Sequence, residues 1–315
     1  MEASQTRTRQ KEALRRALGP EIIGPMDDQH VVEIMLNPDG NLWIDRLGAG
    51  MQCTARIDAV RALTIVNTVA AMLDTVVTGD RPILECELPL DGSRFEALIP
   101  PLVERASFAL RKKALLVFTL EDYVSKGIMT GDQCLAIETA VSDRRNVLVC
   151  GGTGTGKTTL ANAILDCVAK IDTDHRIVVI EDTRELQVSA DNVVFLRTSD
   201  NTDMTRLLRA TMRLRPDRIV VGEVRDGSAL ALLKAWNTGH PGGVGTVHAN
   251  DASAALIRIG QLIQEAGVPP NPELIAEAVN VVVSIKRTSR GRHIEEVAIV
   301  RGWSPSGGFR VERAA

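Results

Sequence analysis

Apolar positions in the first third of the chain follow two different periods. Residues 31–36 and 41–47 have strand-like patterns on either side of Asn37-Pro38-Asp39-Gly40, a turn sequence that predicts a β-hairpin. Residues 55–77 carry apolar side chains at helical spacing with no internal glycine or proline, which predicts one long helix. Further short strands are expected at residues 83–88, 94–99 and 107–111. This succession of strands, one helix and more strands indicates a small α+β domain.

The pattern changes after Lys112-Lys113. From there on, helical and strand-like segments alternate, which is typical of βαβ units and a mainly parallel sheet. Continuous apolar runs predict buried strands at residues 146–150, 177–180 and 219–221. Two last strands, joined by a basic turn at 286–292, are expected at residues 281–286 and 294–300.

The length of 315 residues is more than one average domain needs. We therefore expect an α/β protein with a smaller α+β domain over residues 1–116 and a domain with a mainly parallel sheet over residues 117–315. Residues 1–18 are polar and basic, and we expect a solvated or frayed arm there. The alternative is an arm that touches anionic lipid or a neighbouring subunit.

Composition and charge narrow the class of protein further. The net charge of -3 and the aromatic content of 3% argue against a protein whose main task is to coat nucleic acid. The five cysteines are scattered without a CxxC pair, which suits a reducing compartment and gives no zinc knuckle. Apolar stretches are shorter than the ~18–20 residues of a membrane span. We therefore expect a cytoplasmic protein whose membrane contact, if any, is peripheral.

Residues 151–158 fit the pattern G-x-x-x-x-G-K-[ST] completely, between a predicted strand and a predicted helix. Glycines let successive backbone N–H groups face phosphates, and the helix N-terminus adds partial positive charge. Lys157 is expected to reach the β- and γ-phosphates of ATP, and the Thr158 hydroxyl to bind Mg²⁺. The residues expected to hold the nucleotide are Gly152, Thr153, Gly154, Thr155, Gly156, Lys157, Thr158 and Thr159.

Two acidic residues follow predicted strands and are candidates for catalysis. Glu181 ends the run 177–180, and Glu223 comes soon after 219–221. Ligands of open α/β sheets bind at the carboxyl ends of the strands, so both carboxylates are expected near the phosphates. One would polarise the attacking water and the other would hold the Mg²⁺ shell, and the sequence leaves open which does which.

Two further groups have weaker signals. His240 and His248 flank a glycine-rich segment, which we interpret as a mobile loop whose histidine could sense the γ-phosphate. Arg206, Arg209 and Arg213 have the spacing of one helical face, which favours a salt-bridged or interface role over nucleic-acid contact.

Four ordered motifs resemble those of the secretion ATPase superfamily, which serves type II secretion, type IV pili and type IV secretion. Residues 214–226 resemble its Walker B segment, residues 180–185 its acidic box, and residues 238–250 its histidine box. With the glycine-rich loop these motifs span residues 151–250. The segment 33–43 looks most like conjugal transfer ATPases and their type IV secretion relatives, with pilus-retraction ATPases as the near alternative.

The resemblance implies a homohexameric ring and a RecA-like C-terminal domain, with ATP between the two domains. It implies that Glu181 is the general base, that Glu223 lies near Mg²⁺ and water, and that His248 lies near the γ-phosphate. Arg94 and Arg111 look like the N-domain arginines that reach the γ-phosphate, a role suited to an always-charged donor.

We therefore expect an ATP-hydrolysing ring motor that moves substrate or pilus subunits, with inner-membrane components of a conjugative or type IV secretion system as partners. One alternative is a nucleic-acid motor, since RecA-like cores do both jobs. Another is a scaffold that binds ATP to assemble but barely turns it over.

Overall fold

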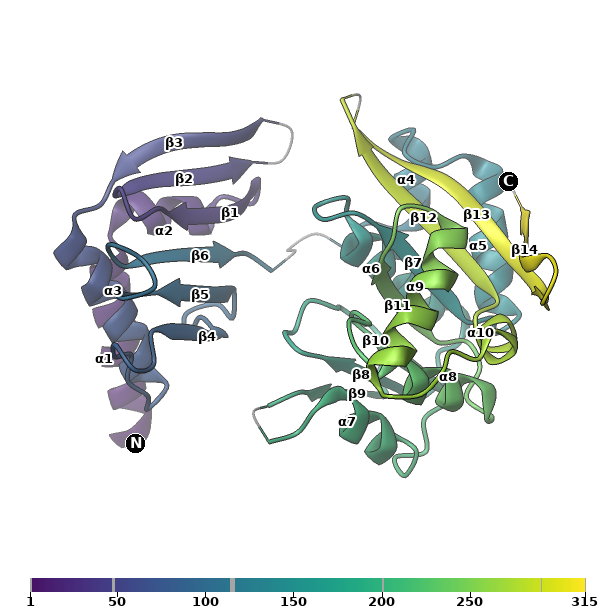
Figure 1. The fold of residues 1–315 in the computed structure, drawn as a ribbon. Helices are drawn as coiled ribbons and strands as arrows, with labels where there is room; N and C mark the ends of the chain where they lie inside the picture. The colour runs from purple at the N-terminus through teal and green to yellow at the C-terminus, as the bar shows by residue number, and fades with distance from the viewer. Residues whose placement is uncertain (1, 47–48, 114–116, 200, 290, 315) are drawn as a thin grey trace. The chain divides into compact units, whose positions relative to one another are not determined.

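The computed structural model describes residues 2–46, 49–113, 117–199, 201–289 and 291–314. The chain divides into two compact units, Met1–Leu115 and Leu116–Ala315 (Figure 1). Each unit has its own sheet and its own hydrophobic core. The expected α/β class of the chain is confirmed.

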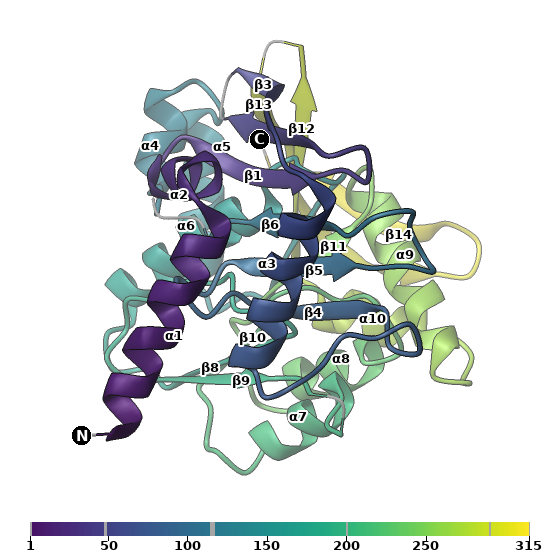
Figure 2. The same ribbon diagram turned by 90° about the vertical axis from the view of Figure 1, so that its left-hand side faces the viewer.

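The described strands of the first unit form an antiparallel six-stranded sheet in the order β3-β2-β1-β6-β5-β4. Its helices are packed in front of one face of this sheet (Figure 2). The predicted hairpin is confirmed as β1 paired with β2. The strands are β1 Val31–Leu36, β2 Asn41–Arg46, β3 Gly50–Arg56, β4 Ile83–Glu87, β5 Arg94–Leu98 and β6 Ser107–Arg111. The helices are α1 Glu2–Leu18, α2 Pro20–Asp27 and α3 Ala59–Met72.

The expected solvated or frayed arm is instead a helix, α1, that packs against α3. Leu14 and Leu18 are both fully buried in the core of the unit. Arg61 of α3 fixes the end of α1, because its guanidinium donates to the carbonyl oxygens of Ala17 and Leu18 at 3.2 and 2.7 Å. Two leucines at helical spacing are enough to dock this otherwise polar segment.

The long helix predicted from residue 55 begins four residues later, at Ala59. Residues 50–56 form β3, which pairs with β2. Asp58 marks the boundary, since its carboxylate accepts hydrogen bonds from the N–H groups of Val60 and Arg61 at 3.0 and 2.9 Å. An N-cap of this kind satisfies helix N–H groups that have no intrahelical partner.

The second unit holds an eight-stranded sheet in the order β14-β13-β12-β7-β11-β10-β8-β9. The strands from β12 to β9 in this order run parallel, and β13 and β14 add antiparallel pairs at one edge. The strands are β7 Val147–Gly151, β8 Ile177–Glu181, β9 Val193–Arg197, β10 Arg218–Val221, β11 Val244–His248, β12 Val281–Thr288, β13 Gly291–Ser304 and β14 Gly308–Arg313.

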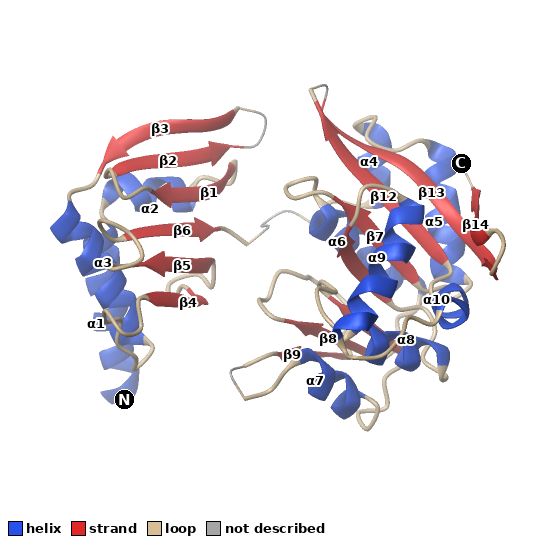
Figure 3. Ribbon diagram, viewed as in Figure 1, coloured by secondary structure: helices blue, strands red, loops and turns tan. Residues whose placement is uncertain are grey.

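Helices cover both faces of this sheet (Figure 3). Side chains alternate between the two cores, so Leu148 of β7 joins one and Val147 and Val149 join the other. On one face lie α4 Leu120–Ser125, α5 Gly131–Ser142 and α6 Lys157–Ile171. On the other lie α7 Met204–Thr211, α8 Ala229–Asn237, α9 Ala252–Glu265 and α10 Pro272–Ala278.

The expected mobile loop between the two histidines is wrong over residues 244–248, which form the buried strand β11 between β7 and β10. Gly243, just before β11, and Gly245, within it, lie close to the Trp236 ring. A Cβ on Gly243 would lie 2.1 Å from Trp236 Nε1, and one on Gly245 would lie 3.3 Å from the same ring. The indole also donates to the carbonyl oxygen of Ile219 at 3.0 Å.

The arginines after β9 separate into different environments. Arg206 and Arg209 lie on α7, but the helix ends before Arg213, so the expected three-arginine helical face is wrong. Arg218 is fully buried and forms an ion pair with Asp172. It also donates to the carbonyl oxygens of Gly242 and Val141, at 2.8 and 3.0 Å. Among the described helices of both units, none is long and apolar enough to cross a membrane.

Candidate functional site

The glycine-rich loop follows β7, and α6 begins at Lys157. Gly154 and Gly156 have φ angles of 70° and 100°, which are left-handed conformations that other residues rarely adopt. A Cβ on Gly151 would come within 2.5 Å of the Ile285 carbonyl oxygen on β12. The loop therefore needs glycine at these three positions, two for backbone conformation and one for packing.

Lys157 is buried at the start of α6, with 8% of its surface exposed. Its Nζ donates to the carbonyl oxygens of Gly151 and Gly152, both at 3.0 Å, and lies 3.3 Å from Nδ1 of His248. The ammonium thus lies inside the curl of the loop, at the positive end of a helix. Such a loop is suited to hold an anion such as a phosphate group.

Polar side chains at the carboxyl ends of neighbouring strands form a continuous chain of contacts. It follows the strand order β7-β11-β10-β8 from Lys157 to His248, then to Glu223, Arg225 and Asp182. His248 Nε2 lies 2.7 Å from Glu223 Oε1. Arg225 Nε lies 3.3 Å from Glu223 Oε2, and its Nη2 donates to Asp182 Oδ2 at 2.6 Å. The sheet topology therefore brings together residues that are far apart in sequence.

The contacts of His248 determine its tautomer. An ammonium only donates, so in the neutral ring Nδ1 accepts from Lys157 and Nε2 carries the proton; Nε2 lies 2.7 Å from Glu223 Oε1 without a hydrogen bond to it. Burial of the ring lowers the pKa of His248, and the positive charge of Lys157 lowers it further, against the opposing effect of Glu223. The imidazole is therefore neutral at pH 7.

Glu181 is the last residue of β8 and organises the loop that follows this strand. It is 5% exposed, and its Oε1 accepts hydrogen bonds from the N–H groups of Glu185 and Leu186 at 3.0 and 2.9 Å. Burial raises the pKa of Glu181, although the two backbone bonds oppose this. A Cβ on Gly222 would lie 2.9 Å from Glu181 Cγ, so the Gly before Glu223 is needed for packing.

The Glu185 carboxylate contacts the glycine-rich loop, and the sequence did not identify Glu185 as a site residue. Its Oε2 accepts a hydrogen bond from the Thr158 hydroxyl at 3.3 Å. The signal was its place in the acidic box, four residues after Glu181. The turn held by Glu181 brings the acidic box back toward α6, and residue spacing alone does not predict this turn.

Arg292 is a second residue that sequence reasoning missed. It lies at the start of β13, and its Nη2 lies 3.4 Å from the Gly154 carbonyl oxygen. A Cβ on Gly156 would lie 3.3 Å from Arg292 Nε, which is buried without a hydrogen-bond partner among the described residues. The basic turn between the last strands was the available signal, but only the pairing of β12 with β7 places it beside the loop.

Arg94 and Arg111 lie in the first unit and are cross-strand neighbours on β5 and β6. Like charges directly opposite each other repel, and acidic residues on the flanking strands β1 and β4 offset this. Glu33 lies opposite Arg111, with 3.7 Å between Oε1 and Nε, and Glu87 lies opposite Arg94. Both arginines thus lie in one row across the sheet.

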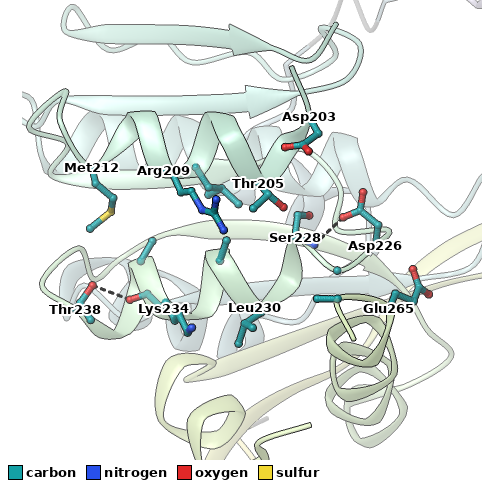
Figure 4. Close-up of a pocket in the computed structure, with 15 residues that line it drawn as sticks. Asp203, Thr205, Arg209, Met212, Asp226, Ser228, Leu230, Lys234, Thr238 and Glu265 are labelled. Carbon is teal, nitrogen blue, oxygen red and sulfur yellow. Dashed lines mark hydrogen bonds between the residues drawn. The ribbon is translucent and has the colours of Figure 1, made fainter. Parts of the chain in front are cut away.

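A groove of about 640 Å³ lies between α7 and α8 (Figure 4). It is lined by apolar residues such as Leu208 and Leu230, and by Arg209, Asp226 and Lys234. None of its lining residues belongs to the glycine-rich loop. The candidate site therefore lies elsewhere, at the strand ends.

The turn after β7 is rich in glycine, and Lys157 lies at the start of the next helix. Acidic residues follow the neighbouring parallel strands. This arrangement in an α/β fold is typical of P-loop proteins. A family model described as "Type II/IV secretion system protein" matches residues 17–304. The chain belongs to this type II/IV secretion system family.

Individual relatives are consistent with this membership. The chain is 48% identical to a probable conjugal transfer protein TrbB from Sinorhizobium fredii, over 99% of this chain and 96% of that one. The structure of the VirB11 ATPase from the Brucella suis type IV secretion system is similar, at 26% identity and a TM-score of 0.50, over 94% of this chain and 96% of that one. The pilus retraction motor PilT with bound ADP shares the fold, with 20% identity, a TM-score of 0.62 and coverage of 93% and 81%.

Proposed function

We propose that this protein is an ATP-hydrolysing motor of a conjugative or type IV secretion system. The observation that carries the proposal is the contact chain from Lys157 through His248 to Glu223 at the carboxyl ends of β7, β11 and β10. It brings a phosphate-binding lysine, a neutral imidazole and a carboxylate to one edge of the sheet. The similarity to a conjugal transfer protein and to a type IV secretion ATPase supports the choice of system.

In this proposal the P-loop, residues 152–159, holds the phosphates of ATP through backbone N–H groups and Lys157. His248 would respond to the presence of the γ-phosphate, because a phosphate oxygen that binds Lys157 competes with the imidazole for the same ammonium. Arg292 would add a positive charge beside Gly154. Arg94 and Arg111 would supply further guanidinium groups to the γ-phosphate, where such groups can raise the rate by ~10³–10⁵ in other P-loop enzymes.

The residues beside the P-loop fit a bound Mg²⁺. The Thr158 hydroxyl and the Glu185 carboxylate are oxygen ligands 3.3 Å apart, and Glu223 offers a third oxygen group just after the end of β10. Among the residues described, no three His, Cys, Asp or Glu side chains form a metal cluster. Mg²⁺ is commonly held by one or two protein oxygens together with substrate phosphates and water. When bound, it would neutralise charge that develops on the phosphates.

The roles of the three glutamates follow from their partners. Glu223, next to the neutral His248, is the candidate to orient the attacking water, and Glu185 is the candidate to hold the Mg²⁺ shell through Thr158. Glu181 has one oxygen committed to two backbone N–H groups, so we propose that it supports the acidic loop rather than acting as the base. This changes the expectation drawn from the family resemblance.

We further propose that the C-terminal unit is a RecA-like motor domain, that the protein works as a homohexameric ring, and that it acts in the cytoplasm at the inner membrane with components of the secretion apparatus. Family membership supports these points. The low aromatic content favours protein cargo over nucleic acid.

Hydrolysis with a matched lysine pair tests the proposal. Lys157→Ala should abolish Mg²⁺-dependent ATP hydrolysis, whereas Lys170→Ala, at an exposed site on the same helix, should leave it unchanged. Equal hydrolysis by Lys157→Ala and the wild type would refute the proposed site. Stimulation by single-stranded DNA that disappears with salt would point to a nucleic-acid motor instead.

A further inference from the structure

Arg225 bridges two acidic residues that come from different strands. Its Nη2 donates to Asp182 Oδ2 at 2.6 Å, and its Nε lies 3.3 Å from Glu223 Oε2. Asp182 follows β8, and Glu223 follows the neighbouring strand β10. One guanidinium thus spans the gap between two strand ends.

The Asp182 end of this bridge is anchored to the sheet. The Thr198 hydroxyl donates to Asp182 Oδ1 at 2.9 Å, and the Thr198 N–H donates to the Glu181 carbonyl oxygen at 3.1 Å. Thr198 directly follows β9, so Asp182 is fixed between β8 and β9. Arg225 is therefore bound at one end by a carboxylate that has a second hydrogen bond of its own, although the side chains of both residues are exposed.

The two oxygens of Glu223 have different partners. Oε1 faces His248 at 2.7 Å and Oε2 faces Arg225 at 3.3 Å. Rotation of the carboxylate would exchange these partners, and a free arginine would take both oxygens in a bidentate pair. Because Asp182 binds Nη2, the Nε–Nη2 edge of the guanidinium is shared between the two carboxylates and is not free to bind both oxygens of Glu223.

We propose that Asp182 and Arg225 form a positioning pair that holds the Glu223 carboxylate toward His248 and the P-loop. The pair touches no reacting atom in this arrangement and acts through Glu223. The proposal rests on the hydrolytic function proposed above, and it adds two residues that hydrolysis requires for geometry rather than for chemistry.

The guanidinium is needed because the bridge uses two different nitrogens. A lysine at position 225 carries its three donors on one nitrogen, so it does not reproduce the spacing of the two guanidinium nitrogens that reach Asp182 and Glu223. Asp182→Asn keeps the oxygen that accepts from Thr198 but removes the charge that retains Arg225. Both substitutions should therefore release Glu223 without removing it.

Steady-state kinetics give the first test. Asp182→Asn and Arg225→Lys should each lower kcat by about 10- to 100-fold, since a shift of about 1 Å in a catalytic group can cost 10²-fold. KM for ATP should change by less than about threefold, because the P-loop contacts remain. The double variant should lose no more activity than the more impaired of the two single variants, as expected for residues that act as a unit. Glu312→Gln removes an exposed ion pair of the same 2.6 Å length to Arg301 and should behave like the wild type.

The NMR chemical shifts of the His248 imidazole give a readout that does not need hydrolysis. In Asp182→Asn the freed arginine should draw the Glu223 carboxylate away from His248 Nε2, so the shifts of the ring nitrogens should change. Glu312→Gln should leave these shifts in place. Unchanged His248 shifts in Asp182→Asn would overturn the positioning pair, even if activity were lost. If the wild type hydrolysed no ATP, the proposed function would fail, and the NMR result would still decide this inference.

Discussion

Lys157 Nζ and His248 Nδ1 lie 3.3 Å apart, although 91 residues separate them in the chain. The contact exists because β11 inserts next to β7, which places the end of one strand beside the loop that follows the other. It makes the histidine a neighbour of the same ammonium that a phosphate would bind. The glycine-rich loop and the end of β11 therefore meet at one place.

This contact predicts a pH dependence of hydrolysis. The pKa of His248 lies below its usual value of about 6.5, so the ring accepts from Lys157 at neutral pH and loses this ability when it gains a proton at lower pH. We expect kcat to decline as pH falls through the lowered pKa. His248→Gln should reduce kcat at pH 8 by about 10²-fold and remove this acid limb. His30→Gln, at an exposed site in the first unit, is the control.

Replacement of the two glutamates of the acidic box should affect different properties: hydrolysis for Glu185 and stability for Glu181. Glu185→Gln should reduce Mg²⁺-dependent hydrolysis by about 10²-fold, with little change in thermal stability. Glu181→Gln should instead change stability. A raised pKa means that the folded state prefers the protonated form, so ionised Glu181 costs stability as pH rises. The gain in Tm from Glu181→Gln should therefore be larger at pH 8 than at pH 5. Equal gains at both pH values would contradict this account of its burial.

Gly243→Ala should destabilise the second unit. The added Cβ would lie 2.1 Å from Trp236 Nε1 and 2.5 Å from the Ile219 carbonyl oxygen, so the indole hydrogen bond to Ile219 must break or the strand must shift. Overpacking of this kind costs about 1–3 kcal/mol. Gly131→Ala, which meets no atom within 4 Å on α5, should cause no such loss in a thermal or urea unfolding experiment.

Arg292→Ala should weaken nucleotide binding more than it weakens stability. Its buried Nε and its Nη2 lie beside Gly156 and Gly154, where a phosphate-binding loop gains from a positive charge. We expect the Kd for ATP to rise by roughly tenfold, which corresponds to about 1.4 kcal/mol. Arg287→Ala removes the exposed partner of Arg292 on β12 and should leave Kd unchanged. A common loss in both variants would indicate a general effect of charge.

Local signals in the sequence were sufficient for the elements that local chemistry specifies. The hairpin turn at residues 37–40 and the glycine-rich loop at 151–158 have fixed residue types at fixed positions, so both could be read directly. The buried strands β7 and β8 could also be predicted, because each is a continuous apolar run.

The features that the sequence did not predict depend on tertiary contacts. Gly243 and Gly245 looked like part of a flexible loop because the sequence does not show that Trp236 packs against them. Glu185 and Arg292 reach the P-loop only through a turn held by Glu181 and through the pairing of β12 with β7. The N-terminal helix was taken for an arm because its segment is mostly polar, and the buried Leu14 and Leu18 and the contacts of Arg61 with its end are tertiary features.

ATP hydrolysis as a function of protein concentration, together with the mass of the protein in solution with and without ATP, tests the motor proposal most directly. The account predicts that specific activity rises with concentration as a ring assembles, and that Lys157→Ala stays inactive at every concentration. Nucleotide binding with no hydrolysis across the concentration range would contradict the motor and favour a scaffold that uses ATP only to assemble.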